Sequence, residues 1–192
     1  MRFLFLGDSI TDAGSYRKPR AEFTGYVKFV ADTLDSSHVC FNHGIRKNLT
    51  ADVMARYDED VKAVSPDFMV LLIGINDVYN TMPQDYEKRL TKLLEMTKAD
   101  FPSIKIVVLE PFLLPEPDRI SWFEELAKIR LAAKNAAKKS ADAFIPLHSI
   151  FQEACKSAPW QDFSLDGVHP EEKGQKLIAE YVRGEIKRLA NV

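Results

Sequence analysis

The sequence predicts a three-layer α/β/α sandwich built on a parallel sheet, and three observations lead to that fold class. Short apolar runs alternate five times with longer segments in which apolar residues recur at helical spacing. The run over residues 68–73 is apolar throughout, as expected for a central strand covered by helices on both faces. Strands joined in this way through helices form parallel sheets with right-handed crossovers.

Length and composition predict one soluble domain spanning residues 1–192. A chain of 192 residues buries roughly 70% of its unfolded surface. The net charge of -2 gives no reason to expect a nucleic acid or an anionic membrane as partner. No apolar stretch has membrane-spanning length, and four apolar residues before Gly7 are too few for a signal peptide, so we expect a cytoplasmic protein. Cys40 and Cys155 are expected to be buried free thiols.

The individual elements follow from apolar spacing and from helix and turn signals. Five strands are expected at residues 3–6, 39–41, 68–73, 104–109 and 144–147. Helices are expected at residues 22–35, 50–64, 86–101, 122–136 and 150–154, with a last helix from Pro170. Thr50 is expected to be the N-cap of the second helix, and Pro170 to be the first helical residue of the last one.

Five polar or small residues fall at one edge of this predicted sheet. Ser9, Gly44 and Asn76 follow the first three strands, and Asp166 and His169 lie in the loop before the last helix. Open α/β sheets place their sites at the carboxyl ends of the strands. Each residue alone has an ordinary structural interpretation, as a turn former, a helix cap or a surface side chain. Together their chemical types are complementary, which favours a functional site.

Nucleophilic catalysis needs these residue types. A serine hydroxyl such as that of Ser9 is a weak nucleophile that requires a nearby base. His169 can take the proton and return it to a leaving group, and Asp166 can orient its ring. The backbone N–H groups of Ser9 and Gly44 and the side-chain amide of Asn76 can stabilise a tetrahedral oxyanion.

Four stretches resemble, in order, the sequence blocks of the SGNH or GDSL-type hydrolases. They are Gly7-Asp8-Ser9, Asn42-His43-Gly44, Gly74-Ile75-Asn76-Asp77 and Asp166-Gly167-Val168-His169. The resemblance implies a flavodoxin-like five-stranded sheet of order 2-1-3-4-5 and hydrolysis of a small-molecule ester without metal or cofactor. It also implies that Ser9 is the nucleophile, that Asp166 and His169 complete a triad, and that Ser9, Gly44 and Asn76 form the oxyanion hole.

A narrower resemblance concerns the substrate. Residues 58–61, 72–77 and 110–115 are similar to stretches of bacterial SGNH esterases that deacetylate xylo-oligosaccharides, which implies short acyl esters such as acetylated carbohydrates. Arg46 and Lys47 depart from the pattern, because the second block usually carries small residues there. They would narrow the site, favour an anionic substrate, or point into solvent.

Further residues near these blocks have open roles. Asp8 and Asp77 are interpreted as structural, whereas Trp160 and Phe163 are candidates for pocket walls. Phe112 is a third candidate wall, for which core packing is at least as good an interpretation. The loops at residues 12–20 and 111–120 are interpreted as lids or as part of an interface. The oligomeric state stays open, and a homo-oligomer is one of the possibilities.

Two alternative functions remain at this stage. The first is a thioesterase or lysophospholipase of the same family. The second is a flavodoxin-like module that binds a phosphate or a nucleotide at residues 9–15, where hydroxyl groups favour it. Asp8 and Asp12 argue against phosphate binding, because they would repel an anion at a helix N-terminus. That alternative also leaves Asn76 and His169 without a role.

Overall fold

The five predicted strands form one parallel sheet in the computed structural model, which describes residues 1–78 and 80–190. The order is β2-β1-β3-β4-β5, which confirms the expected 2-1-3-4-5 arrangement. The strands are β1 (Arg2–Gly7), β2 (Val39–Gly44), β3 (Phe68–Leu72), β4 (Lys105–Leu109) and β5 (Ala143–Ile145).

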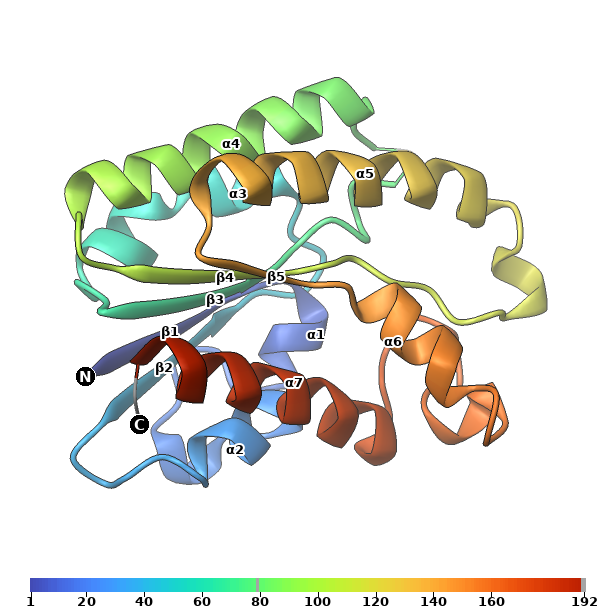
Figure 1. The fold of residues 1–192 in the computed structure, drawn as a ribbon, viewed down its shortest axis with the longest axis horizontal. Helices are drawn as coiled ribbons and strands as arrows, with labels where there is room; N and C mark the ends of the chain where they lie inside the picture. Colours follow the sequence, from blue (N-terminus) through green and yellow to red (C-terminus); the bar gives the residue numbers. More distant parts are fainter. Residues whose placement is uncertain (79, 191–192) are drawn as a thin grey trace.

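Helices cover both faces of this sheet, so that the fold has three layers (Figure 1). On one side lie α3 (Thr50–Ala55), α4 (Pro83–Asp100) and α5 (Trp122–Ser140). On the other side lie α1 (Ser9–Asp12), α2 (Gly25–Ala31), α6 (Leu147–Ala154) and α7 (Glu172–Ala190). The alternation of apolar strands and amphipathic helices therefore predicted the fold class correctly.

The central strands are buried on both faces. The side chains from Phe3 to Leu6 in β1 are fully buried, and those from Phe68 to Leu72 in β3 are at most 1% exposed. Burial of each such side chain stabilises the fold by about 1.5–3 kcal/mol. The register pairs Gly7 with both Gly44 and Leu72, so β1, β2 and β3 end at one level and the segments that follow share an edge.

The helix expected over residues 22–35 is shorter in the structure. Residues Arg20–Glu22 form a 3₁₀ turn, and α2 covers only Gly25–Ala31. The Arg20 guanidinium donates to the carbonyl oxygens of Ala31 and Leu34. These acceptors lie at and beyond the end of α2, so the Arg20 side chain satisfies carbonyl oxygens that no further helical turn would satisfy.

The segment expected to form one helix over residues 50–64 is divided. It consists of α3, in which Thr50 is the first residue and Leu49 the N-cap, and a π-helical turn at Asp58–Lys62. The assignment of Thr50 as N-cap was wrong, because its N–H and its hydroxyl both donate to Asp77 Oδ2 at 3.0 Å. This contact also confirms the structural role expected of Asp77.

Two boundaries near the C-terminus also differ from expectation. β5 ends at Ile145, and α6 begins at Leu147 rather than at residue 150. The last helix, α7, begins at Glu172, so Pro170 is not its first residue. Pro170 instead forms an isolated antiparallel bridge with Ser164, which closes the loop that carries Asp166 and His169.

Candidate active site

Ser9 stands at the junction between β1 and α1. A side chain on Gly7 would collide with the carbonyl oxygen of Leu72 and the hydroxyl of Thr11. Glycine therefore allows the end of β1 to pack closely against β3 and α1. Asp8 is buried and caps α1 by accepting the Ile10 N–H at 3.0 Å, which confirms its predicted structural role. Ser9 becomes the first residue of α1 at the sheet edge.

Ser9, His169 and Asp166 are brought together in line. The Ser9 Oγ lies 3.0 Å from His169 Nε2, and His169 Nδ1 lies 2.7 Å from Asp166 Oδ2. With the Nδ1–H donated to the carboxylate, Nε2 is free to accept the serine proton. The His169 and Asp166 side chains are 54% and 42% exposed, so the site opens at the surface.

The loop from Ser164 to Pro170 holds this geometry. Asp166 Oδ1 accepts the backbone N–H groups of Val168 at 2.9 Å and His169 at 2.7 Å. Ser164 Oγ donates to the carbonyl oxygen of His169 at 2.8 Å. Burial raises the pKa of Asp166, but the hydrogen bonds from the His169 side chain and from the two N–H groups outweigh it and lower the pKa to about 2. The carboxylate is therefore ionised at neutral pH.

Asn76 follows β3 at the same sheet edge. Its side-chain Nδ2 donates to the backbone carbonyl oxygen of Asn48 at 3.1 Å. The backbone carbonyl oxygen of Asn76 accepts a hydrogen bond from Asn80 Nδ2 at 2.7 Å. An amide carries two N–H bonds, and the contact with Asn48 uses one of them.

Gly44 does not present a free donor in this structure. Its N–H donates to Asn42 Oδ1 at 3.0 Å. A Cβ at this position would collide with the backbone of Thr11 and Asp12, so the glycine allows β2 to pack against α1. The close packing is an observed role of Gly44, and its oxyanion role remains a prediction.

Arg46 and Lys47 both lie in the loop after β2. The Arg46 side chain is 75% exposed, with its Nε 3.8 Å from Asp12 Oδ2, which agrees with the solvent-facing interpretation. Lys47 is exposed and has a positive φ of 64°, a conformation that costs a non-glycine residue about 1–2 kcal/mol.

The predicted aromatic pocket walls belong mainly to the core. Phe112 is fully buried and stacks on Phe151 with ring centroids 4.5 Å apart. Phe163 is 4% exposed and meets the same Phe151 ring edge-on. Trp160 packs against the core and is partly buried. Phe112 and Phe163 therefore fill the interior rather than line the site.

Sequence reasoning missed Arg119 and Trp122, which line a cleft of about 350 Å³ beside Asp166. Arg119 Nε donates to the carbonyl oxygen of Asp166 at 2.9 Å, and its guanidinium lies 4.8 Å from the centroid of the Trp122 ring. Glu116, Asp118 and Leu165 complete the lining. The available signal was their position after β4 at the same sheet edge.

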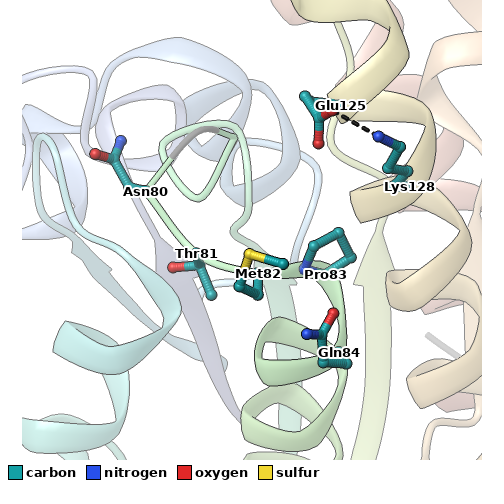
Figure 2. A pocket seen from close by; sticks show the side chains of 7 residues that line it. All are labelled: Asn80, Thr81, Met82, Pro83, Gln84, Glu125 and Lys128. Carbon is teal, nitrogen blue, oxygen red and sulfur yellow. Dashed lines mark hydrogen bonds and ion pairs between the residues drawn. The ribbon is translucent and has the colours of Figure 1, made fainter.

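A second cleft, of about 730 Å³, opens between the segment after β3 and α5 (Figure 2). Its lining combines polar and apolar side chains and consists of Asn80, Thr81, Met82, Pro83, Gln84, Glu125 and Lys128. The bond from Asn80 to Asn76 connects this cleft to the sheet edge that carries Ser9.

The described part of the chain holds no group of three or more His, Cys, Asp or Glu side chains arranged to bind a metal. Within residues 1–78 and 80–190, no helix combines the length and the apolar character needed to cross a bilayer. Both cysteines are free, with Cys40 buried and Cys155 only partly buried, so the expectation of burial was correct for the first alone.

The fold, with its parallel sheet of order 2-1-3-4-5 and helices on both faces, is that of a GDSL-type hydrolase. The sequence model of the GDSL-like lipase/acylhydrolase family matches residues 5–177, and the chain belongs to this family. It is a carboxylic ester hydrolase.

Similar proteins carry related descriptions. An acetylxylan esterase from Geobacillus stearothermophilus is 30% identical over 96% of this chain and 93% of its own length. Its crystal structure superposes with a TM-score of 0.85, at 28% identity and the same coverage. A crystal structure described as a GDSL-like lipase, from Parabacteroides merdae, gives a TM-score of 0.89 at 32% identity, covering 98% of this chain and 95% of the other.

A more distant relative has a broader description. The thioesterase 1/protease 1/lysophospholipase L1 of Escherichia coli is 25% identical over 98% of this chain and 84% of its own length.

Proposed function

We propose that the protein is a serine esterase that removes short acyl groups from small-molecule esters through an acyl-enzyme. The observation that carries this proposal is the line from Ser9 Oγ through the His169 ring to Asp166, with heavy-atom distances of 3.0 and 2.7 Å. These distances lie within the range needed for proton transfer between a nucleophile and its base.

In the first half-reaction, Ser9 Oγ attacks the ester carbonyl carbon while His169 Nε2 takes the hydroxyl proton. The tetrahedral intermediate collapses by breaking the bond to the alcohol oxygen, which receives that proton from His169. The acyl group is then bound to Ser9. In the second half-reaction, water attacks this acyl group while His169 takes a proton from the water. The bond from the acyl carbon to Ser9 Oγ then breaks, His169 returns the proton to Oγ, and the free acid leaves. Asp166 stays ionised throughout and stabilises the imidazolium.

The oxyanion would be stabilised by the Ser9 N–H and the Asn76 amide. The first N–H groups of a helix have no intrahelical acceptor, and Ser9 is the first residue of α1. The Asn76 amide retains one N–H beyond its contact with Asn48. A contribution from Gly44 requires that its N–H leave Asn42 Oδ1.

Acetylated carbohydrates are the substrate class that we propose. The description of the acetylxylan esterase relative supports this class. The cleft beside Asp166 supports it too, because it combines the Trp122 ring with the charged side chains of Glu116, Asp118 and Arg119. An aromatic ring beside hydrogen-bonding groups suits a sugar, which has both apolar and polar faces.

Two other functions serve as alternatives. The Escherichia coli relative favours a thioesterase or lysophospholipase as the second candidate. Phosphate binding at α1 is disfavoured by the structure. Asp8 accepts the Ile10 N–H, and Asp12 accepts the N–H groups of Ser15 and Tyr16. Two buried carboxyl groups therefore already occupy three backbone donors of this segment, where a phosphate would have to bind.

The test is hydrolysis of 4-nitrophenyl esters of increasing acyl length, together with acetylated xylo-oligosaccharides and a palmitoyl thioester. We expect acetate esters to be cleaved faster than long-chain esters. A long chain gains about 0.8 kcal/mol only for each CH₂ that is buried, and both clefts beside the site carry charged side chains. Faster cleavage of long-chain esters or thioesters would favour the second candidate. The Ser9→Ala variant is the control.

A further inference from the structure

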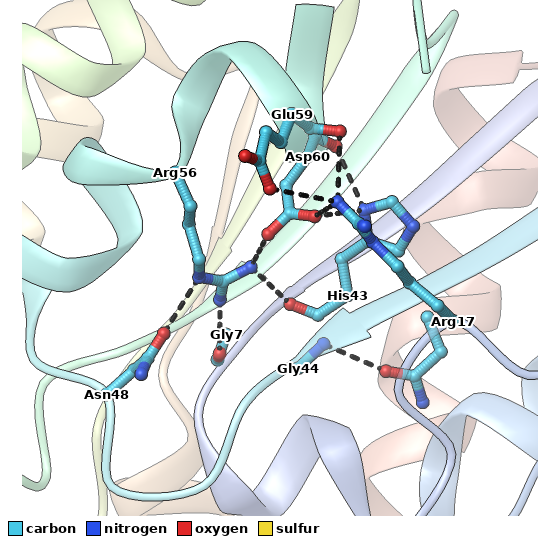
Figure 3. Close-up of polar contacts among 9 residues, drawn as sticks. Gly7, Arg17, His43, Gly44, Asn48, Arg56, Glu59 and Asp60 are labelled. Carbon is cyan, nitrogen blue, oxygen red and sulfur yellow. Dashed lines mark hydrogen bonds and ion pairs between the residues drawn. The ribbon is translucent and has the colours of Figure 1, made fainter. Parts of the chain in front are cut away.

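Arg56 occupies a largely buried position beside the ends of β1 and β2. It is the C-cap of α3, and its side chain is 12% exposed. Its guanidinium makes four contacts within the network shown in Figure 3. Nε donates to Asn48 Oδ1 at 2.8 Å, and Nη2 donates to the Gly7 carbonyl oxygen at 3.0 Å. Nη1 donates to the His43 carbonyl oxygen at 2.9 Å and to Asp60 Oδ2.

Two of these contacts reach the segments that carry the proposed catalytic groups. Gly7 is the last residue of β1 and lies two positions before Ser9. Asn48 holds Asn76, because its carbonyl oxygen accepts Asn76 Nδ2 at 3.1 Å. One planar guanidinium therefore joins the strand end that leads to Ser9 with the residue that orients Asn76.

Asp60 fixes the guanidinium from the opposite side. This carboxylate is 1% exposed and also meets Arg17 Nη2 at 2.8 Å and His43 Nδ1 at 3.1 Å. Burial opposes ionisation of Asp60, but hydrogen bonds from His43, Arg56 and Arg17 outweigh it and hold its pKa well below the usual range. Asp60 stays charged, so Arg56 keeps an ionised partner across the working pH range.

Stability alone does not explain such a network. Replacing a buried ion pair by well-packed apolar groups is often neutral or stabilising, so the pair is weak evidence for a stabilising role. A planar fork of fixed donors, in contrast, can hold several acceptors in one relative geometry. The acceptors here belong to the ends of β1 and β2, the loop that follows β2, and the π-helical turn.

We propose that Arg56 is a positioning residue for ester hydrolysis, which sets the Asn76 amide relative to Ser9 through its bonds to Asn48 and Gly7. This inference rests on the proposed function. Arg56 touches neither substrate nor the reacting atoms. Its effect on the rate is indirect: a displacement of about 1 Å in a catalytic group can lower the rate about 10²-fold.

The test compares Arg56→Lys and Arg56→Gln with Arg183→Gln, a change at an exposed arginine on α7. We expect both Arg56 variants to lose up to about 10²-fold in kcat on a small acetate ester with little change in KM. Lysine should not restore the rate, because an ammonium group cannot reproduce the fork. The Arg183→Gln variant should keep wild-type kcat.

A double-mutant cycle separates positioning from a merely structural effect. If Arg56 acts through Asn76, Arg56→Gln should lower kcat by a smaller factor in an Asn76→Ala background than in the wild type. Equal factors in both backgrounds would overturn the proposal, as would a folded Arg56→Gln variant with wild-type kcat. If Arg56→Gln fails to fold, Asn48→Ala enters the same cycle, because it removes only the Nε contact.

The proposed function is checked separately in the same assay. Wild-type protein must turn over the ester and Ser9→Ala must not. Failure of that comparison would reject the esterase mechanism, whereas an active wild type with additive Arg56 and Asn76 effects would reject only the positioning role.

Discussion

Ser9 Oγ lies 3.0 Å from His169 Nε2, although 160 residues separate the two positions in the chain. Each partner is fixed by its own local structure. Asp8 caps the helix that begins with Ser9, and the bridge between Ser164 and Pro170 closes the loop that presents His169. The hydrogen bond is therefore formed before any substrate arrives, as expected of an organised base and nucleophile.

The Ser9→Ala variant should lose ester hydrolysis by a factor on the order of 10⁴ or more, as triad members do in other serine hydrolases. The side chain is only half-buried, so the melting temperature should change little. Steady-state kinetics and thermal unfolding on the same preparation check both expectations. Turnover near the wild-type level in the purified variant would remove Ser9 from the mechanism.

Activity should fall in acid because the imidazole of His169 must be unprotonated to act as base. General-base catalysis by a histidine predicts that kcat/KM falls as the pH is lowered into the acid range. Asp166, whose pKa is lowered to about 2, remains ionised in that range. A flat profile down to about pH 4 would contradict a histidine base.

Protonation of Asp166 does not explain the loss of activity in acid through unfolding. A carboxyl group whose folded-state pKa is lowered contributes stability above its unfolded pKa, near 3.8. That contribution is lost only as the pH falls from there toward 2. Circular dichroism measured at the same pH values as the kinetics therefore separates loss of the fold from loss of the catalytic base.

The sheet could be predicted because its signal is local. Runs such as residues 68–73 carry their own evidence of burial, and five of them alternating with helices define the layers. The helix ends could not be predicted, because distant side chains decide them. Arg20 takes the carbonyl oxygens at the end of α2, and Asp77 takes the donors of Thr50.

The same distinction applies to the candidate site. Ser9, Asp166 and His169 stand in recognisable short motifs, and the structure brings them together. The hydrogen bond from the Gly44 N–H to Asn42 Oδ1 depends on the rotamer of the Asn42 side chain, which no sequence motif predicts. The contact from Arg56 to Gly7 spans 49 residues, so no spacing in the sequence pointed to it.

The Asp8→Asn variant should gain stability relative to the wild type as the pH rises. Asp8 is 1% exposed, and its burial, with a smaller contribution from Asp77, raises its pKa to about 7. A raised folded-state pKa means that the carboxyl stabilises the fold while it is protonated, and that this contribution is lost between about pH 4 and pH 7.

Asparagine can still accept the Ile10 N–H but cannot ionise, so the two proteins should diverge by at most about 1.4 kcal/mol per pH unit in that window. Urea unfolding of both proteins at about pH 5 and pH 8 measures the difference. A constant difference at the two pH values would contradict a neutral Asp8 in the folded state.

The Trp122→Ala variant tests the cleft beside Asp166. If the sugar of an acetylated xylo-oligosaccharide lies against this ring, KM for that substrate should rise about 2- to 13-fold, which corresponds to an aromatic contact of ~0.5–1.5 kcal/mol. The kcat/KM for 4-nitrophenyl acetate should stay near wild type, because that substrate does not extend into the cleft. Leu131→Ala, at an exposed position on α5, is the matched control. Equal effects on both substrates would place the sugar elsewhere.

The Asn76→Ala variant separates catalysis from structure at the third strand. If the amide donates to the oxyanion, kcat should fall by about 10²–10³, or ~2.7–4 kcal/mol in the transition state. KM should change little, because the charge develops only after the ground state. If Asn76 only ties the loop to Asn48, the change should cost ~1 kcal/mol of stability, the net value of one hydrogen bond, and leave kcat unaltered. Asn80→Ala removes a bond to the Asn76 carbonyl oxygen but keeps the amide, so it should retain most of kcat. A destabilised Asn76→Ala protein with wild-type kcat would exclude Asn76 from the oxyanion hole.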